Sequence, residues 1–296
     1  RVISKAIQTM SFQVSRRDML AVGLTAVVPL PSLAQTPAAR LPRLITISGA
    51  ITEVVYALGA EGQLVGTDTT SLFPAAAQKT PKVGYLRQLS AEGVLSLKPD
   101  AVIATTEAGP PVVLEQLRSA GVQIELVKSE YTWADVAAKV RAVGRAARRD
   151  EAAQMLQARL ETEWNQVTQQ VAADKRAKPR VLFMFSPGPS PQVAGQGTAA
   201  DAMIRLAGGV NALTGFQGYR PMTAEAMASA APDIILTTDQ GLETLGGADK
   251  FWQRPELALT PAFRRRALVA QDALLLLGFG PRLPQAVREL HTRFHA

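Results

Sequence analysis

The sequence predicts an α/β protein of two Rossmann-like β-α-β lobes joined by a single long α-helix, with a ligand cleft between the lobes. Two observations predict this class. In both halves of the chain, short β-branched segments alternate with helix-like segments, a pattern typical of parallel sheets covered by helices. Between the halves, residues 132–173 contain no proline, little glycine and many Ala, Leu, Gln, Glu and Arg residues, which favours helix.

The first half contains four predicted strands. RLITIS leads through a turn into the helix-like GAITEVVYALGA, and a second strand, LVGTD, follows. AVIAT and IELVK are short and apolar, as buried parallel strands are, and the helix-like VVLEQLRSAG separates them. In chain order, these segments are residues 43–48, 49–60, 64–68, 101–105, 112–121 and 124–128.

The middle segment is predicted to form a helical hairpin that ends in one long helix, with Asp150 as its N-cap. A second series of strands and helices begins at residues 178–186 (KPRVLFMFS) and continues to a C-terminal helix. We therefore expect an N-terminal lobe at residues 35–131, a helical segment with the interlobe helix at 132–177, and a C-terminal lobe at 178–296.

An internal repeat supports two lobes of similar build. Residues 89–106 (LSAEGVLSLKPDAVIATT) align without a gap with residues 222–239 (MTAEAMASAAPDIILTTD). The alignment keeps a helix, a Pro-Asp turn and the following strand together. Two copies this far apart do not make a solenoid, so the repeat indicates one copy in each lobe.

Residues 1–34 are predicted to be a cleaved export signal. SRRDML places Arg16 and Arg17 ahead of an apolar run, and SLA at residues 32–34 offers the small residues that a signal peptidase prefers. The run is too short to span a bilayer, which takes about 20 residues. The paired arginines resemble a twin-arginine signal, and an ordinary secretory signal is the alternative. The sequence therefore predicts a mature protein in the periplasm that starts near Gln35, with Met10 as a candidate natural start.

Charge and cysteine content exclude several classes of function. Lys and Arg exceed Asp and Glu by 32 to 25, a modest surplus without basic runs that interleave with aromatic residues. Nucleic-acid binding is therefore not expected. The chain has no cysteine, which excludes disulfides and thiolate chemistry.

The segment VGYLRQLSAEGVLSLKPD, residues 83–100, contains a tyrosine, Tyr85, on a predicted loop. Functional side chains are often carried by loops on a rigid scaffold. Together with the export signal, the two lobes and the long helix, this segment resembles the periplasmic binding proteins of haem ABC importers. These belong to one class with cobalamin-binding and siderophore-binding proteins. The resemblance covers the chain from about Arg43 onward.

The resemblance implies that Tyr85 is the axial ligand of a transported haem iron and that Arg87 lies beside its phenolate. Ferric iron is hard and favours an anionic oxygen, and tyrosinate is a known axial haem ligand. A free tyrosine loses its proton only near pH 10, so a neighbouring cation helps to stabilise the phenolate. For an arbitrary Tyr-x-Arg sequence, a packed tyrosine beside a solvated arginine would be the ordinary interpretation.

Further haem contacts are predicted by composition and by internal symmetry. The hydroxyl groups of Thr69, Thr70 and Ser71 are candidates to bind the propionates. In the second lobe, GFQGYRPM precedes the repeat helix as the Tyr85 loop precedes its own. Symmetry therefore predicts Tyr219 and Arg220 across the cleft from Tyr85. Arg220 is expected at a propionate or the rim, and Tyr219 or Phe216 on the ring.

Two glutamates are predicted to dock the protein on its transporter. Glu92 and Glu225 occupy matching positions in the repeat, each in the first turn of a helix, where a carboxylate favours the helix dipole. The resemblance implies that one glutamate of each lobe meets arginines of an inner-membrane permease, which works with an ATPase. We expect a monomer that captures and delivers its cargo.

His291 and His295 are the two histidines of the chain and are expected on a C-terminal helix, outside the pocket. A single protein axial ligand is therefore predicted, and the number of haems stays open. Carriers of bare zinc or manganese use clusters of His, Asp and Glu, so that function is not expected. Cobalamin or ferric-siderophore binding remains the alternative. An exported α/β enzyme is a further alternative, although G-x-S-x-G and Walker motifs are absent, and GQGTAAD lacks the fingerprint spacing of a phosphate loop.

Overall fold

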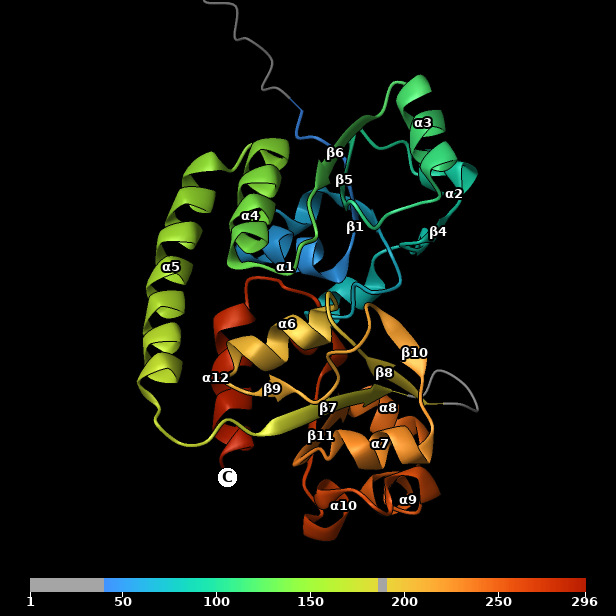
Figure 1. The fold of residues 1–296 in the computed structure, drawn as a ribbon. Coiled ribbons are helices and arrows are strands. Elements are labelled where there is room, and N and C mark those ends of the chain that lie inside the picture. Colours follow the sequence, from blue (N-terminus) through green and yellow to red (C-terminus); the bar gives the residue numbers. More distant parts are fainter. Residues whose placement is uncertain (1–39, 186–190) are drawn as a thin grey trace, which may run out of the picture. The chain divides into compact units, whose positions relative to one another are not determined.

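The computed structural model describes residues 40–185 and 191–296, so the predicted export signal lies outside the described residues. The first lobe is built on a four-stranded parallel sheet in the order β2-β1-β5-β6 (Figure 1). The elements of this lobe are β1 Leu44–Ile47, α1 Gly49–Ala57, η1 Glu61–Gln63, β2 Leu64–Thr67, η2 Ala75–Lys79, β3 Gly84–Tyr85, β4 Gln88–Leu89, α2 Ala91–Ser96, β5 Ala101–Thr105, α3 Pro111–Ser119 and β6 Gln123–Val127.

The two central strands of this sheet are buried along their whole length. Every residue of β1 and of β5 is buried, because helices cover both faces of the sheet. This explains why the two segments are apolar throughout rather than alternating. The strands β3 and β4 form a separate two-stranded hairpin outside the sheet.

Two helices follow the first lobe, α4 Trp133–Ala147, which packs on that lobe, and α5 Asp150–Ala173, the long helix that runs on to the second lobe (Figure 1). A capping box at Thr132 and Asp135 begins α4, and Arg148 ends it in the left-handed conformation. Asp150 was expected as the N-cap of α5, but the structure places Arg149 there and makes Asp150 the first helical residue. Its carboxylate therefore lies in the first turn, where it favours the helix dipole.

The second lobe has a six-stranded mixed sheet in the order β10-β8-β7-β11-β12, with β9 also paired to β7 (Figure 1). β7, β9, β11 and β12 are parallel, whereas β8 and β10 pair antiparallel. The elements are β7 Arg180–Phe185, β8 Gln192–Ala194, α6 Ala199–Leu206, β9 Val210–Asn211, β10 Tyr219–Pro221, α7 Ala224–Ala230, β11 Ile234–Thr238, α8 Asp239–Thr244, α9 Ala248–Phe251, η3 Pro255–Leu257, α10 Pro261–Arg265, β12 Leu268–Gln271, α11 Ala273–Leu277 and α12 Leu283–Phe294.

The internal repeat gives the same local structure in both lobes. Ser90 caps α2 by accepting a hydrogen bond from the Gly93 N–H, and Thr223 caps α7 by accepting one from Ala226. In each lobe the capped helix leads into a fully buried strand, β5 or β11. The predicted two-lobe α/β fold with one long connecting helix is confirmed.

A single cluster of buried apolar side chains continues from one lobe to the other. It includes Val54 of α1, Val140 of α4, Leu160 of α5 and Leu290 of α12. The shared core favours lobes that move little against each other.

In the described part of the chain, no helix has the length and apolar character that a membrane span requires.

Candidate functional site

A cavity of about 640 Å³ lies at the carboxyl ends of the parallel strands and is lined by both lobes. In open α/β sheets, this edge is where ligands usually bind. Its first-lobe wall comes from the Tyr85 hairpin and from segments after β1, β2, β5 and β6. Its second-lobe wall is largely apolar and includes Phe183, Phe185, Tyr219, Leu274 and Leu277.

The hairpin of β3 and β4 presents Tyr85 to this cavity. A loop was expected here, and the structure forms a tight turn in which Tyr85 pairs with Gln88. Gly84 has a φ of 106°, a conformation that glycine adopts without strain. Leu86 is buried, and its carbonyl accepts a hydrogen bond from the Gly109 N–H at 2.9 Å. These contacts hold the hairpin while the Tyr85 side chain remains 38% exposed.

Arg87 joins the Tyr85 hydroxyl to a carboxylate. Its Nη1 donates to the Tyr85 hydroxyl oxygen at 2.6 Å, and its Nη2 forms an ion pair with Glu107. Glu107 also accepts hydrogen bonds from the hydroxyls of Ser129, at 3.1 Å, and Tyr131, at 3.2 Å. The Tyr85 oxygen therefore faces a cation whose orientation is set by a network of three other side chains.

Sequence reasoning did not select Glu107, Ser129 or Tyr131. A signal was present, because Glu107 follows β5 and Ser129 follows β6, at the sheet edge where ligands bind. The structure shows that Glu107, Ser129 and Tyr131 all line the cavity.

Three tyrosines line the cavity, and their surroundings differ. Burial, with Glu107 nearby, raises the pKa of Tyr131 to about 12. Burial also raises the pKa of Tyr219 above its ordinary value. Both groups are thus held as neutral phenols. Tyr85 alone among these three has a guanidinium that donates to its oxygen.

The hydroxyl-rich loop after β2 is organised around a buried aspartate. The hydroxyls of Thr70 and Ser71 donate to Asp68, at 2.7 and 2.9 Å, and Ser71 is fully buried. Their protons are therefore not available to a ligand carboxylate, and Ser71 is not among the residues that line the cavity. Thr69 and Thr70 do line it. Of the three predicted residues, Thr69 therefore stays a candidate hydroxyl donor.

The predicted second-lobe residues divide between the two sides of a strand. Tyr219 lines the cavity, with its ring edge-on to Phe185 at a centroid distance of 5.4 Å. Arg220 and Phe216 are not among the lining residues, and the Arg220 guanidinium stacks on Phe216 at 3.7 Å instead. Neighbouring residues of a strand point to opposite faces, so Tyr219 and Arg220 cannot share a side of β10.

The remaining predicted residues lie away from the cavity lining. Glu92 and Glu225 are exposed in the first turns of α2 and α7. Hydrogen bonds from its own backbone N–H and from Thr223 hold the pKa of Glu225 below its ordinary value. His291 and His295 lie at the end of α12 and do not line the cavity, as the sequence predicts.

The fold and cleft define the class of protein. Residues 44–273 match the family model described as periplasmic binding protein, and the chain belongs to this family. The expected likeness to periplasmic haem-binding proteins is also confirmed. The periplasmic heme-binding protein BhuT, solved in complex with two hemes, is 47% identical with a TM-score of 0.81, covering 86% of this chain and 97% of its own.

A second solved structure and a curated relative extend this comparison. The periplasmic heme-binding protein RhuT from Roseiflexus sp. RS-1 is 38% identical with a TM-score of 0.82, over 86% of this chain and 98% of its own. The vitamin B12-binding protein of Pectobacterium carotovorum subsp. carotovorum (strain PC1) is 26% identical over 76% of this chain and 80% of its own. The chain is thus similar to carriers of two different cargoes.

Proposed function

We propose that this protein captures ferric haem in the cavity between its lobes, with Tyr85 as the axial ligand, and delivers it to an inner-membrane ABC transporter. The observation that carries the proposal is the 2.6 Å hydrogen bond from Arg87 to the Tyr85 hydroxyl at the cavity wall. A phenolate is a strong ligand for ferric iron, and Arg87 places a positively charged donor beside the oxygen that would bind it.

The cavity suits a large, flat, mostly apolar ligand. Its volume of about 640 Å³ is within the range of about 300–1,000 Å³ that small-molecule sites occupy. Phe183, Phe185 and Tyr219 supply an aromatic wall in the second lobe, with the iron ligand in the first lobe. A haem held by Tyr85 would therefore turn one face towards these rings, where its apolar surface is removed from water.

Glu107 gives Arg87 a fixed place in this arrangement. Without a second partner, the long Arg87 side chain would lose rotamer freedom for a single hydrogen bond. The carboxylate of Glu107 pairs with one guanidinium nitrogen while another faces Tyr85. We therefore assign Glu107 as a positioning residue for the iron ligand, while Thr69 stays a candidate contact for a propionate.

The delivery step is proposed to use Glu92 and Glu225, one on each lobe. Both are exposed and lie in corresponding first helical turns, so a permease with two arginine sites could contact both at once. We also propose a periplasmic location, reached by twin-arginine export of the monomer. Binding and delivery, rather than catalysis, account for the Tyr85 site.

The test is a visible-spectrum titration of the mature protein with ferric haem, in parallel with Tyr85→Phe and Tyr219→Phe. The expected result is a saturable Soret shift with high-spin charge-transfer bands in the wild type and in Tyr219→Phe. Tyr85→Phe keeps the ring but lacks the oxygen, so it is expected to lose those bands. The titration end point gives the number of haems.

The same titration with cyanocobalamin and with a ferric siderophore tests the alternative cargoes. Saturable binding of either one, with no Soret change from haem, would overturn the proposal. An identical haem spectrum in the wild type and in Tyr85→Phe would refute the ligand assignment and leave haem as the cargo.

A further inference from the structure

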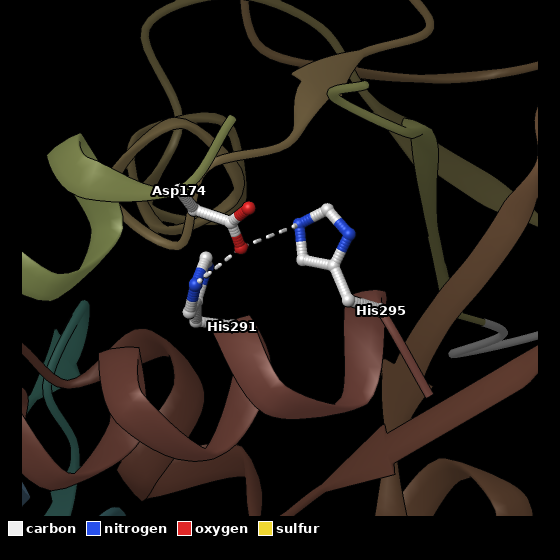
Figure 2. A group of neighbouring side chains, drawn as sticks. All are labelled: Asp174, His291 and His295. Carbon is white, nitrogen blue, oxygen red and sulfur yellow. Dashed lines mark ion pairs between the residues drawn. The ribbon is translucent and has the colours of Figure 1, made fainter. Parts of the chain in front are cut away.

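A second cluster of side chains lies far along the chain from the Tyr85 site, where the interlobe helix ends. Asp174 follows the last residue of α5, and His291 and His295 lie four residues apart at the end of α12. Figure 2 shows the two imidazole rings turned towards the same carboxylate oxygen. Asp174 Oδ2 is 3.1 Å from His291 Nε2 and 3.9 Å from His295 Nε2.

The hydrogen bonding of His291 shows which of its ring nitrogens faces Asp174 without a hydrogen. Its Nδ1 lies 2.9 Å from the carbonyl oxygen of Ala207. A carbonyl only accepts, so Nδ1 carries the hydrogen, and in the neutral ring Nε2 presents a lone pair. That lone pair faces the carboxylate of Asp174, which is also an acceptor. Two acceptors 3.1 Å apart need a cation between them, either a proton or a metal ion.

Three converging donors favour the metal ion. A proton on one imidazole serves a single contact, whereas a metal ion binds Asp174, His291 and His295 together. The three donor atoms lie within 4.8 Å of one another. In a tetrahedral zinc site with bonds of about 2.0–2.2 Å, neighbouring donors are about 3.3 Å apart. The separations of 3.1 and 3.9 Å from Asp174 Oδ2 to the two imidazole nitrogens lie on either side of that value.

The surroundings of the cluster are those of a supported metal site. A metal-bound histidine usually donates its other ring N–H to a carbonyl or carboxylate, as His291 does to Ala207. Arg176 donates to both oxygens of Asp174, which fixes the plane of the carboxylate. The side chains of Asp174, His291 and His295 are 14%, 15% and 9% exposed, so little rotamer freedom remains to be lost on binding.

We propose that Asp174, His291 and His295 bind one Zn²⁺ ion, or a similar borderline metal, and so clip the end of the interlobe helix to the C-terminal helix. Two imidazoles and one carboxylate favour zinc over the hard cations Mg²⁺ and Ca²⁺, which prefer oxygen donors. A small cavity of about 240 Å³ adjoins the cluster and includes Lys178 and Arg205 in its wall. The open coordination position therefore suits water or an anion.

The test uses untagged mature protein, because an affinity tag would add imidazoles. After EDTA treatment and dialysis, Zn²⁺ alone is titrated by calorimetry, and the bound metal is counted by elemental analysis. We expect one Zn²⁺ per chain with micromolar or tighter affinity, and an affinity roughly 100-fold weaker in His291→Gln and in His295→Gln. Arg288→Gln, at an exposed position on the same helix, is the matched control and should bind as the wild type does.

Two further readouts, a Co²⁺ spectrum and thermal unfolding, test the site without calorimetry. Co²⁺ bound to the wild type should give intense visible bands of a low-coordinate site. Saturating Zn²⁺ should also raise the melting temperature of the wild type by about 5 °C, and leave that of His291→Gln unchanged.

Absence of Zn²⁺ binding, or equal binding by a variant that lacks both histidines, would overturn the proposal. The cluster would then be an imidazolium–carboxylate pair. The chain has two histidines and no cysteine, so imidazole-dependent binding can arise only at this site. Since the cluster lies outside the Tyr85 cavity, the haem titration is a separate measurement, and either result can fail alone.

Discussion

Arg282 and Glu53 form a bidentate ion pair that joins the C-terminal segment to the first lobe. Arg282 Nε and Nη2 donate to the two carboxylate oxygens of Glu53, at 2.7 and 2.6 Å. The Glu53 side chain is 4% exposed, and the Arg282 guanidinium also stacks on Phe73 at 3.7 Å. Burial raises the pKa of Glu53, although Arg282 opposes this effect. The pair thus stabilises a carboxylate that would otherwise be costly to bury.

Replacing Arg282 by methionine is expected to reduce the free energy of unfolding by about 3 kcal/mol, because Glu53 is left charged and unpaired in the interior. The double variant Glu53→Met with Arg282→Met should recover most of this loss, since it buries no charge. Urea unfolding of the wild type, Glu53→Met, Arg282→Met and the double variant measures the coupling. Additive losses in the double variant would contradict the explanation.

Replacing Arg87 by glutamine is expected to weaken haem binding by about tenfold, because the variant loses the charge-assisted hydrogen bond to the Tyr85 oxygen that is proposed to bind the iron. Spectrophotometric titration with ferric haem measures this affinity. Arg118→Gln, which removes an exposed arginine from α3 of the same lobe, should bind as the wild type does. Equal affinity in all three proteins would remove Arg87 from the proposed site.

Lys139 should make the stability of the protein depend on pH in the alkaline range. Its ammonium is buried and donates to the carbonyl of Phe279 at 2.8 Å, and burial lowers its pKa to about 8 from 10.5. Between these values the unfolded chain binds more protons than the folded protein. The free energy of unfolding therefore rises with pH across this window, by up to roughly 3 kcal/mol, and the contribution is constant below it.

Lys139→Met isolates this contribution, because other groups titrate equally in both proteins. Urea unfolding near pH 7.5 and again near pH 10.5 should show that the free energy of unfolding of the wild type rises relative to that of the variant as the pH rises. A difference independent of pH would mean that the pKa of Lys139 is not lowered by folding.

Gly144 allows the close approach of α4 and α5. A Cβ atom at this position would lie 2.5 Å from the Cβ of Ala153. Gly144→Ala is therefore expected to destabilise the protein by about 1–3 kcal/mol, despite the higher helix propensity of alanine. Gly62→Ala is the control, since a Cβ there meets nothing within 4 Å. Thermal unfolding should separate the two variants, and equal melting temperatures would contradict the tight crossing.

Charge reversal of Glu92 and Glu225 is expected to impair delivery without changing haem affinity. Each Glu→Lys change places a cation against the proposed permease arginines, so haem uptake into vesicles that contain the transporter should fall by at least about tenfold. Glu151→Lys is the matched control, because Glu151 is an exposed carboxylate in the first turn of α5. Normal uptake with both reversals would refute the docking proposal.

Short sequence patterns are enough to predict the two-lobe architecture and to single out Tyr85 and Arg87 as candidates. The repeat of residues 89–106 and 222–239 predicts the two similar lobes, because helix caps and buried strands are encoded in short stretches of chain. Tyr85 and Arg87 are two residues apart, so their contact follows from one local turn. Local sequence patterns therefore predict features, such as caps, strands and turns, that depend on a few neighbouring residues.

Which distant residues contact Tyr85 and Arg87 follows from the packing of the folded chain. Glu107 lies 20 residues from Arg87, and Tyr131 lies 24 residues from Glu107. Packing turned Tyr219 to the cavity and Arg220 away from it, although symmetry predicts both. It also brought Asp174 to His291 and His295. Such contacts depend on how strands and helices stack and on which face each side chain occupies, and spacing along the chain does not contain that information.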